Sequence, residues 1–208
     1  MRVPSLHLVP PDVREKFECH EWRNAAAILK EAHAEEWEDL IAMLRAFTLR
    51  RTWITEPGGR KSKVSQWVDD FLGPRGWLET GFETAIVVGD ERRDSPTHKV
   101  DCYKSHVGLE VEWNNKDPFY DRDLNNFRLL FDLRVIEVGV IFTRCDELQG
   151  IFDDLGRGAS FGASTTHMSK LLPRLDGGSG GGCPVLVFGI TARTYDDDGG
   201  EASERARP

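Results

Sequence analysis

Three carboxylates stand among apolar residues in the segment VDCYKSHVGLEVEWNN, which covers residues 100–115. Glu110 and Glu112 are two residues apart, and Asp101 lies nine positions before Glu110. Side chains alternate across a β-strand, so both glutamates of an extended segment point to the same face. If the preceding segment pairs antiparallel with this one through the short connection at residues 104–106, Asp101 falls near the glutamates. The spacing therefore predicts an acidic cluster on one side of a strand pair.

Like charges on one face repel one another, and a divalent cation removes that repulsion. Mg²⁺ binds carboxylate and carbonyl oxygens at about 2.0–2.1 Å, and the backbone carbonyl of Val111 lies between the two glutamates. Such a site suits phosphodiester hydrolysis, because the metal ion lowers the pKa of a bound water and stabilises charge on the phosphoryl oxygens. The alternative is a solvated strand edge, and the spacing alone leaves both interpretations open.

The elements that must position these residues follow from hydrophobic periodicity. Helices are expected at residues 22–49, 62–72, 119–133, 145–155 and 165–172. Strands are expected at residues 84–88, 99–103, 107–113, 135–143 and 184–190. In the helix at 119–133 we expect Asp121, Asp123 and Arg128 to face outward. This order predicts an α/β fold with a mixed central β-sheet flanked by helices.

Composition describes an ordinary globular chain of 208 residues, with 39% hydrophobic and 30% charged residues. No apolar run reaches the roughly 20 residues that a membrane span needs, and we find no signal peptide. Four cysteines, at positions 19, 102, 145 and 183, lack metal-type spacing, which favours reduced thiols in a cytoplasmic protein. We expect a single domain over residues 1–194, with N-terminal helices, and an acidic, disordered tail at 195–208.

The charge distribution bears on the class of partner. A net charge of −8 argues against a nonspecific nucleic-acid coat protein, whose affinity comes from neutralising phosphates. It does not exclude an enzyme that acts on DNA, because the charge is segregated along the chain. Basic residues gather between positions 45 and 63, at Arg50, Arg51, Arg60, Lys61 and Lys63.

Asp101, Glu110 and the Val111-Glu112 pair resemble the active-site strand pair of the PD-(D/E)xK nuclease superfamily. The chain is more closely similar to the BglII-type restriction endonucleases, including relatives that cut at purine-GATC-pyrimidine. The resemblance covers about residues 58–190. It includes GLEVEWNN with the helix after it, VIEVGVIFTR, the glycine-serine loop GRGASFGAS and the last strand CPVLVFGI. It implies a restriction-endonuclease-like fold.

The resemblance further implies a Mg²⁺-dependent type II restriction endonuclease that acts as a homodimer on a palindromic site in double-stranded DNA, with a GATC-containing site as the family-level expectation. A cognate DNA methyltransferase would belong to the same system. Asp101 would ligate the metal directly, Glu110 directly or through water, and Val111 through its carbonyl. Glu112 stands where most of the superfamily has lysine and the BglII type has glutamine, so we expect it to position the attacking water or a second metal ion.

DNA contacts are predicted around the same strands. Asn114 and Asn115 follow the catalytic strand and either read adenine in the major groove or turn the chain into a loop. Ser160, Ser164 and Thr165 lie where the family has a recognition loop. The basic segment Arg60, Lys61, Ser62 and Lys63 precedes a helix N-terminus, which favours anions, and either contacts phosphate or forms a solvated surface.

Two other functions remain open at this stage. One is a repair or nicking nuclease of the same superfamily, and the other is a non-catalytic DNA-binding module whose glutamates no longer organise a metal ion. Among the histidines, His106 is interpreted as a surface turn residue and not as a catalytic base, and His20, His98 and His167 form no constellation with cysteine or serine. A serine or cysteine nucleophile is therefore not expected.

Overall fold

Six strands form the central sheet of this protein. The structure is a computed structural model that describes residues 5–56, 59, 61–94, 97–116 and 118–198. In spatial order the strands are β1 (Phe17–Trp22), β9 (Val185–Ile190), β8 (Val138–Arg144), β7 (Val107–Glu112), β6 (Val100–Lys104) and β3 (Leu78–Thr80). Strands β7, β8 and β9 are parallel, whereas β1, β6 and β3 pair antiparallel with their neighbours. The sheet is therefore mixed, as the sequence predicts.

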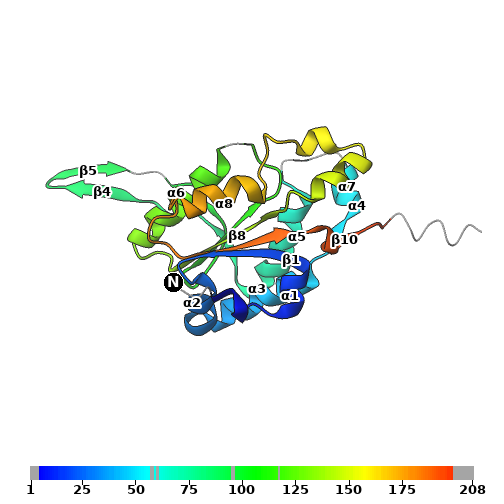
Figure 1. The fold of residues 1–208 in the computed structure, drawn as a ribbon. Coiled ribbons are helices and arrows are strands. Elements are labelled where there is room, and N and C mark those ends of the chain that lie inside the picture. Colours follow the sequence, from blue (N-terminus) through cyan, green and yellow to red (C-terminus); the bar gives the residue numbers. More distant parts are fainter. Residues whose placement is uncertain (1–4, 57–58, 60, 95–96, 117, 199–208) are drawn as a thin grey trace, which may run out of the picture.

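Helices cover both faces of this sheet, as Figure 1 shows. One face carries α1 (Pro11–Lys16), α2 (Ala25–Ala32), α3 (Ala34–Ala46) and α5 (Lys63–Leu72), and the opposite face carries α6 (Phe119–Asp132) and α8 (Met168–Asp176). The shorter helices α4 (Arg51–Thr55) and α7 (Leu148–Asp154) lie near one end of the sheet. All residues of β7, β8 and β9 are buried, which is the expected state of parallel strands between two helix layers.

Two hydrophobic clusters, one on each side of the sheet, make up the core. The larger cluster contains Leu109, Val111 and Phe142 together with apolar residues of α2, α3 and α5. The smaller cluster contains Ile141 and Val187 together with apolar residues of α6 and α8. Alternate residues of each central strand thus belong to opposite layers.

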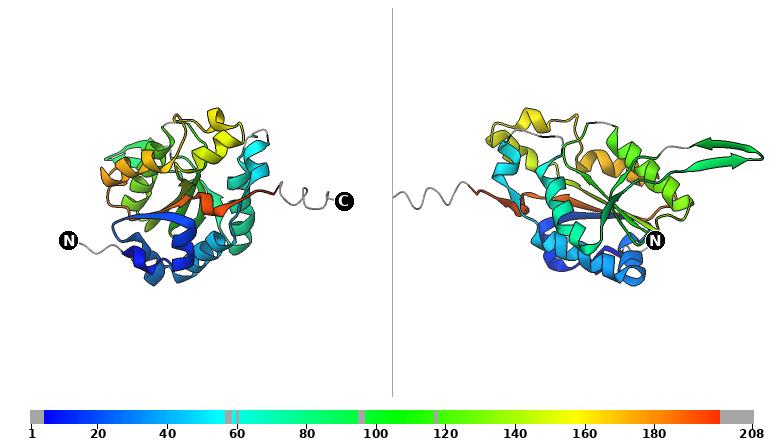
Figure 2. Two further views of the ribbon diagram at one scale, coloured as in Figure 1. Left: turned by 45° about the vertical axis from the view of Figure 1, so that its right-hand side comes forward. Right: turned by 180° about the vertical axis from the view of Figure 1, so that it is seen from behind.

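Several short elements complete the chain. The 3-10 helices are η1 (Ser5–Leu8), η2 (Gly73–Arg75), η3 (Gly158–Phe161) and η4 (Ala192–Thr194). Strands β4 (Ala85–Val88) and β5 (Glu91–Asp94) form a hairpin of their own, and β2 (Leu49–Arg50) pairs in parallel with β10 (Tyr195–Asp196). The β4–β5 hairpin extends away from the body, as Figure 1 and the right-hand view of Figure 2 show. Its residues Ile86, Val87 and Val88 are exposed.

Most predicted elements are present, one predicted helix is wrong in its extent, and one predicted strand lies in a separate hairpin. The helix expected at residues 22–49 is interrupted at His33, and the chain forms β1 before it. The strand expected at residues 84–88 belongs to the β4–β5 hairpin and not to the central sheet. Helix α5 begins after Ser62, whose hydroxyl accepts a hydrogen bond from the backbone N–H of Ser65, so this start follows the N-cap rule.

The domain limits stay a prediction. Residues 195–198 contact the body: Asp197 pairs with Arg51, and Asp198 accepts a hydrogen bond from the hydroxyl of Thr52. The remaining residues of the predicted tail, 199–208, lie outside the described part of the chain. Among the described helices, none combines the length and the apolar character that a membrane crossing requires.

Candidate functional site

The hairpin of β6 and β7 positions the predicted carboxylates. Its two-residue loop, Ser105-His106, has positive φ angles of 43° and 69°, the conformation of a type I′ turn. This turn fixes the register in which Cys102 faces Leu109. Glu110 and Glu112 therefore project from the same face of β7, and Leu109 and Val111 pack into the larger cluster on the other face.

Asp101 lies at an irregularity of β6. Leu78 and Thr80 of β3 pair with Tyr103 and Val100, so two steps along β3 correspond to three along β6. Consistent with this β-bulge, Val100 and Cys102 belong to different clusters although they are two residues apart. Bulges often re-aim a side chain beside an active site. Here Asp101 is half-buried, and its two neighbours in β6, Val100 and Cys102, point to opposite faces of the sheet.

Asp101 forms hydrogen bonds with Glu110 and Val111 of β7. Its backbone N–H donates to Oε2 of Glu110 at 3.4 Å, and its carboxylate oxygen Oδ2 accepts a hydrogen bond from the backbone N–H of Val111 at 3.0 Å. The predicted neighbourhood of Asp101, Glu110 and Val111 is thus present. The contact between Asp101 and Glu110 runs through the main chain of Asp101.

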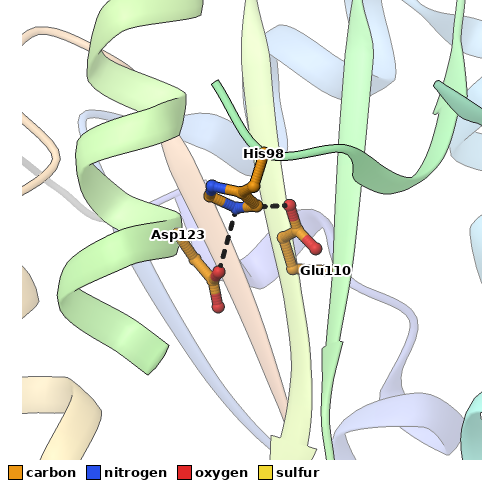
Figure 3. A group of neighbouring side chains, drawn as sticks. All are labelled: His98, Glu110 and Asp123. Carbon is orange, nitrogen blue, oxygen red and sulfur yellow. Dashed lines mark ion pairs between the residues drawn. The ribbon is translucent and has the colours of Figure 1, made fainter. Parts of the chain in front are cut away.

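Glu110 belongs to a tighter group with His98 and Asp123, drawn in Figure 3. The imidazole Nε2 atom of His98 lies 3.2 Å from Oδ1 of Asp123 and 3.5 Å from Oε1 of Glu110. Within the described residues, these three side chains form the one group of three potential metal ligands whose donor atoms all lie within 4.8 Å of one another. Neither Asp101 nor Glu112 is a member of this group.

The expectation that Asp123 faces outward is wrong, because its exposed fraction is 0%. It lies on the face of α6 that also carries Tyr120, Leu124 and Phe127, all of which are buried. Helical periodicity could have found Asp123, since residues three and four apart share a helix face. For His98 the sequence offers no such signal, because the residue lies in the segment that leads into β6.

Two further groups support Glu112, which is 1% exposed. The side-chain amide of Asn115 donates to Oε2 of Glu112 at 2.8 Å. The guanidinium of Arg122 lies 3.8 Å from Oε1 of Glu112 and donates to Asp123 at 3.0 Å. We refer to Glu110, Glu112 and Asp123 together with His98 as the buried acidic cluster.

Burial sets the protonation of this cluster. It is the main cause that raises the pKa of Glu110, and the charges of Asp123 and Asp101 add to it. Burial likewise raises the pKa of Glu112, with Asp123 as the next cause, and the pKa of Asp101. Although burial opposes charge on its ring, the interactions of His98 with Asp123 and Glu110 raise the pKa of this histidine to about 9. Glu110, Glu112, Asp101 and His98 therefore hold protons to higher pH than the same groups in water.

The donor set of the cluster and Asp101 fits a divalent cation. Oε1 of Glu110 and Oδ2 of Asp123 are buried and make no hydrogen bond. Buried polar atoms in proteins are nearly always paired, and an unpaired one calls for a partner such as an ion. Carboxylate oxygens and the carbonyl of Val111 are the ligands that Mg²⁺ prefers.

An open cleft of about 790 Å³ adjoins Asp101. Predicted residues gather on its walls: Asp101, Val111, Asn114, Asn115, Lys61, Lys63 and Ser160. The wall also contains Arg157, Glu56 and Glu79, so cations and carboxylates are mixed. Lys61 forms an ion pair with Asp69, and Lys63 lies 3.7 Å from Glu56. Arg60 lies outside the described residues.

The glycine- and serine-containing loop is held by Arg144, a residue that sequence reasoning missed. The side chain of Arg144 is buried and donates to the carbonyl of Phe161 at 2.7 Å and to the hydroxyl of Thr165 at 2.9 Å. Thr165 is buried as well, and its hydroxyl accepts the hydrogen bond from Arg144 within the loop. Ser160 and Ser164 are exposed. The amide of Asn114 donates to the carbonyl of Ser160 at 3.0 Å and ties the loop to the end of β7.

A protein-family model described as restriction endonuclease BglII/BglIII matches residues 17–190. The chain belongs to this family. The BglII/BglIII match confirms the resemblance found in the sequence, and the mixed sheet between helix layers agrees with a restriction-endonuclease-like fold. As a member of the family, the chain is a restriction endonuclease, a hydrolase whose substrate is DNA. A search of curated proteins found no match.

Proposed function

We propose that this restriction endonuclease is a Mg²⁺-dependent type II enzyme that cuts both strands of a palindromic site as a homodimer. The observation that carries the proposal is the position of Asp101, which lines the open cleft and whose N–H donates to the buried Glu110. A phosphate in the cleft would thus lie beside oxygen ligands supplied by two strands. The palindrome follows from symmetry, because two identical subunits present the same surface to the two strands.

The metal ligands in this proposal are Asp101, Glu110 and the carbonyl of Val111. A bound Mg²⁺ ion would supply Lewis-acid stabilisation of the phosphoryl oxygens and a water of lowered pKa. The residues of the chain orient these groups: the hydrogen bond from the N–H of Val111 fixes the Asp101 carboxylate, and Asn115 fixes the Glu112 carboxylate. Glu112 accepts a hydrogen bond from the attacking water or holds a second ion, since it stands where relatives carry lysine or glutamine.

DNA contacts are proposed for the walls of the cleft. Lys61 and Lys63 flank Ser62 at the start of α5, where cationic side chains and free backbone N–H groups favour phosphate. Asn114 and Ser160 on the cleft wall are proposed base-reading or phosphate contacts. Ser164 is proposed as well; it is exposed in the same loop as Ser160 but does not line the cleft. Asn115 and Thr165 act as supports, because their side chains already hold Glu112 and Arg144. A GATC-containing site and a cognate methyltransferase complete the proposal.

Cleavage of unmodified phage DNA tests the proposed function. With Mg²⁺ we expect discrete fragments, and sequencing their ends gives the site and the cut position together. The double variant Asp101→Ala/Glu110→Ala should lose cleavage by at least about 10³-fold, because metal ligands act as a unit. Asp121→Ala is the matched control, since Asp121 is an exposed carboxylate of α6 that pairs with Arg174.

The same digest separates the alternatives. Smears or cuts that depend on DNA structure would favour a repair or nicking nuclease. Persistent absence of cleavage, together with duplex affinity and no Mg²⁺ or Mn²⁺ binding in calorimetry, would favour a non-catalytic DNA-binding module. Cleavage retained by the double variant would refute the assignment of Asp101 and Glu110.

A further inference from the structure

The interior side of the buried acidic cluster has the geometry of a metal site. Ligands that are adjacent in an octahedral shell, with bonds of about 2.1 Å, lie about 3.0 Å apart, and tetrahedral ligands about 3.4 Å apart. The distances from Nε2 of His98, 3.2 Å to Asp123 and 3.5 Å to Glu110, match these separations. The three side chains come from different segments: His98 from the segment that leads into β6, Glu110 from β7 and Asp123 from α6 (Figure 3).

Two oxygens in this group make no hydrogen bond although their side chains are almost fully buried, and the contact of one of them, Oε1 of Glu110, with His98 is an ion pair at 3.5 Å. Glu110 and Asp123 are 1% and 0% exposed, and Oε1 of the former and Oδ2 of the latter make no hydrogen bond. Arg122 does not meet this need, because its hydrogen bonds reach Oδ1 of Asp123 and not Oδ2. A cation between the two carboxylates would pair both orphaned oxygens at once.

We propose that His98, Glu110 and Asp123 form a second cation site that takes a divalent first-row transition ion, with Mn²⁺ as the defining probe. The proposal rests on the proposed function in one respect, namely that Glu110 is shared with the ion held by Asp101 and Val111. Oε2 of Glu110 faces the backbone of Asp101, and Oε1 faces His98. The carboxylate thus bridges the two positions.

The imidazole decides the class of ion. Oxygen-only sites suit Mg²⁺ and Ca²⁺, whereas an imidazole nitrogen beside carboxylates favours Mn²⁺, Fe²⁺ and Zn²⁺. Entry from solvent is available through His98, whose side chain is 22% exposed. The competing description is a metal-free ion triplet in which a protonated His98 bridges two carboxylates.

Metal binding by the whole chain distinguishes these descriptions without any measurement of activity. Chelator-treated protein is titrated with Mn²⁺, and electron paramagnetic resonance counts the bound ions. Spin-echo modulation then reports ¹⁴N coupling from a coordinated imidazole. The variants are His98→Ala and the nearly isosteric Asp123→Asn, with His20→Ala as the control histidine, which is partly exposed on β1 and pairs with Glu18.

We expect two Mn²⁺ ions per chain with ¹⁴N coupling in the native protein and in His20→Ala. His98→Ala should lose the coupling and one ion, and Asp123→Asn should weaken that ion at least about 10-fold. Mg²⁺ affinity should change less in His98→Ala than Mn²⁺ affinity. Absence of ¹⁴N coupling in the native protein, or Mn²⁺ binding unchanged in both variants, would overturn the second site.

An Asp101→Asn variant keeps the two proposals separable. We expect it to lose cleavage and the ion at Asp101 while it retains one Mn²⁺ ion with ¹⁴N coupling. A native protein that binds one ¹⁴N-coupled ion yet never cleaves DNA would count against the proposed function and leave the His98 site standing. Cleavage with Mg²⁺ but no nitrogen-coupled Mn²⁺ would remove the second site alone.

Discussion

Asp101 and Glu110 illustrate how a bulge and a tight turn act together at the scale of single residues. The type I′ turn fixes the register of the hairpin, and the bulge in β6 turns Asp101 out of the regular alternation. As a result its carboxylate faces the cleft and accepts from Val111, while its N–H reaches Glu110.

The burial of Glu110 makes a prediction for the metal-free protein. Its folded pKa is raised above the unfolded value of 4.5, so the folded state binds more protons and stability falls as pH rises above about 4.5. The variant Glu110→Gln has no ionisable group at this position, so its stability lacks this contribution to the pH dependence. We expect the metal-free variant at pH 8 to be more stable by about 1–3 kcal/mol, given about 1.4 kcal/mol per unit of raised pKa, and to lose cleavage.

Urea unfolding at pH 5 and pH 8, with chelator present, checks this prediction. The gain should be larger at pH 8 than at pH 5, because at low pH the wild-type carboxyl is already protonated. Glu137→Gln is the control, since Glu137 is mostly exposed and pairs with His33. Equal stability of the wild type and Glu110→Gln at pH 8 would show that burial of Glu110 carries no cost.

At the scale of elements, the distance between β8 and α6 decides whether the cluster forms. Gly139 of β8 lies under Phe127 of α6, and a Cβ atom there would come within 2.5 Å of the ring. The absence of a side chain at Gly139 lets α6 approach the sheet. Asp123 lies one helical turn before Phe127 on the same helix, so the same close approach brings Asp123 to Glu110.

Gly139→Ala is therefore expected to destabilise the fold by about 1–3 kcal/mol, the usual cost of overpacking a core. Thermal and urea unfolding measure the loss, and Mn²⁺ affinity should fall with it because α6 shifts away from β7. Gly150→Ala in α7 is the matched control: no atom lies within 4 Å of its new Cβ. Alanine there should stabilise the helix by up to about 1 kcal/mol. An unchanged free energy of unfolding in Gly139→Ala would mean that the ring of Phe127 moves aside without cost.

The whole molecule has a net charge of −8, and its substrate, DNA, is a polyanion. Among the described residues that line the cleft, Lys61, Lys63 and Arg157 carry positive charge, and Lys61 and Lys63 each lie near a carboxylate. We infer that a divalent ion completes the DNA-binding surface as well as the chemistry. Without it, the carboxylates of Asp101, Glu110 and Glu112 repel the phosphate that must come closest once they are ionised, so the repulsion grows as the pH rises through their raised pKa values.

This inference predicts weak metal-free binding of duplex DNA that tightens on addition of Ca²⁺. At alkaline pH, above the raised pKa of Glu110, the variant Asp101→Asn/Glu110→Gln should bind the duplex at least about 10-fold more tightly than the wild type in chelator, because two ionised carboxylates near the phosphate lose their charge. Fluorescence anisotropy at fixed salt measures this. Asp121→Asn/Glu137→Gln removes equal formal charge away from the cleft and should change affinity little. Equal gains in both variants would attribute the effect to net charge alone.

Much of the fold was predictable because it depends on local periodicity. Helices α5 and α6 and strands β6, β7, β8 and β9 lie close to their expected limits. The interruption at His33 and the separate β4–β5 hairpin were not predictable in the same way. A strand-like pattern at residues 84–88 does not say whether a strand joins the central sheet or pairs only with its neighbour in a hairpin.

The sequence by itself determined that Glu110 and Glu112 share a face, because alternation along a strand follows from covalent geometry. It also determined the family, through Asp101, Glu110 and their flanking segments. Only the tertiary structure decided that Asp123 and His98 join Glu110, and that Arg144 holds the loop. These contacts depend on how closely α6 approaches the sheet and where the chain enters β6. Both follow from side-chain packing between segments distant in sequence, which no local pattern records.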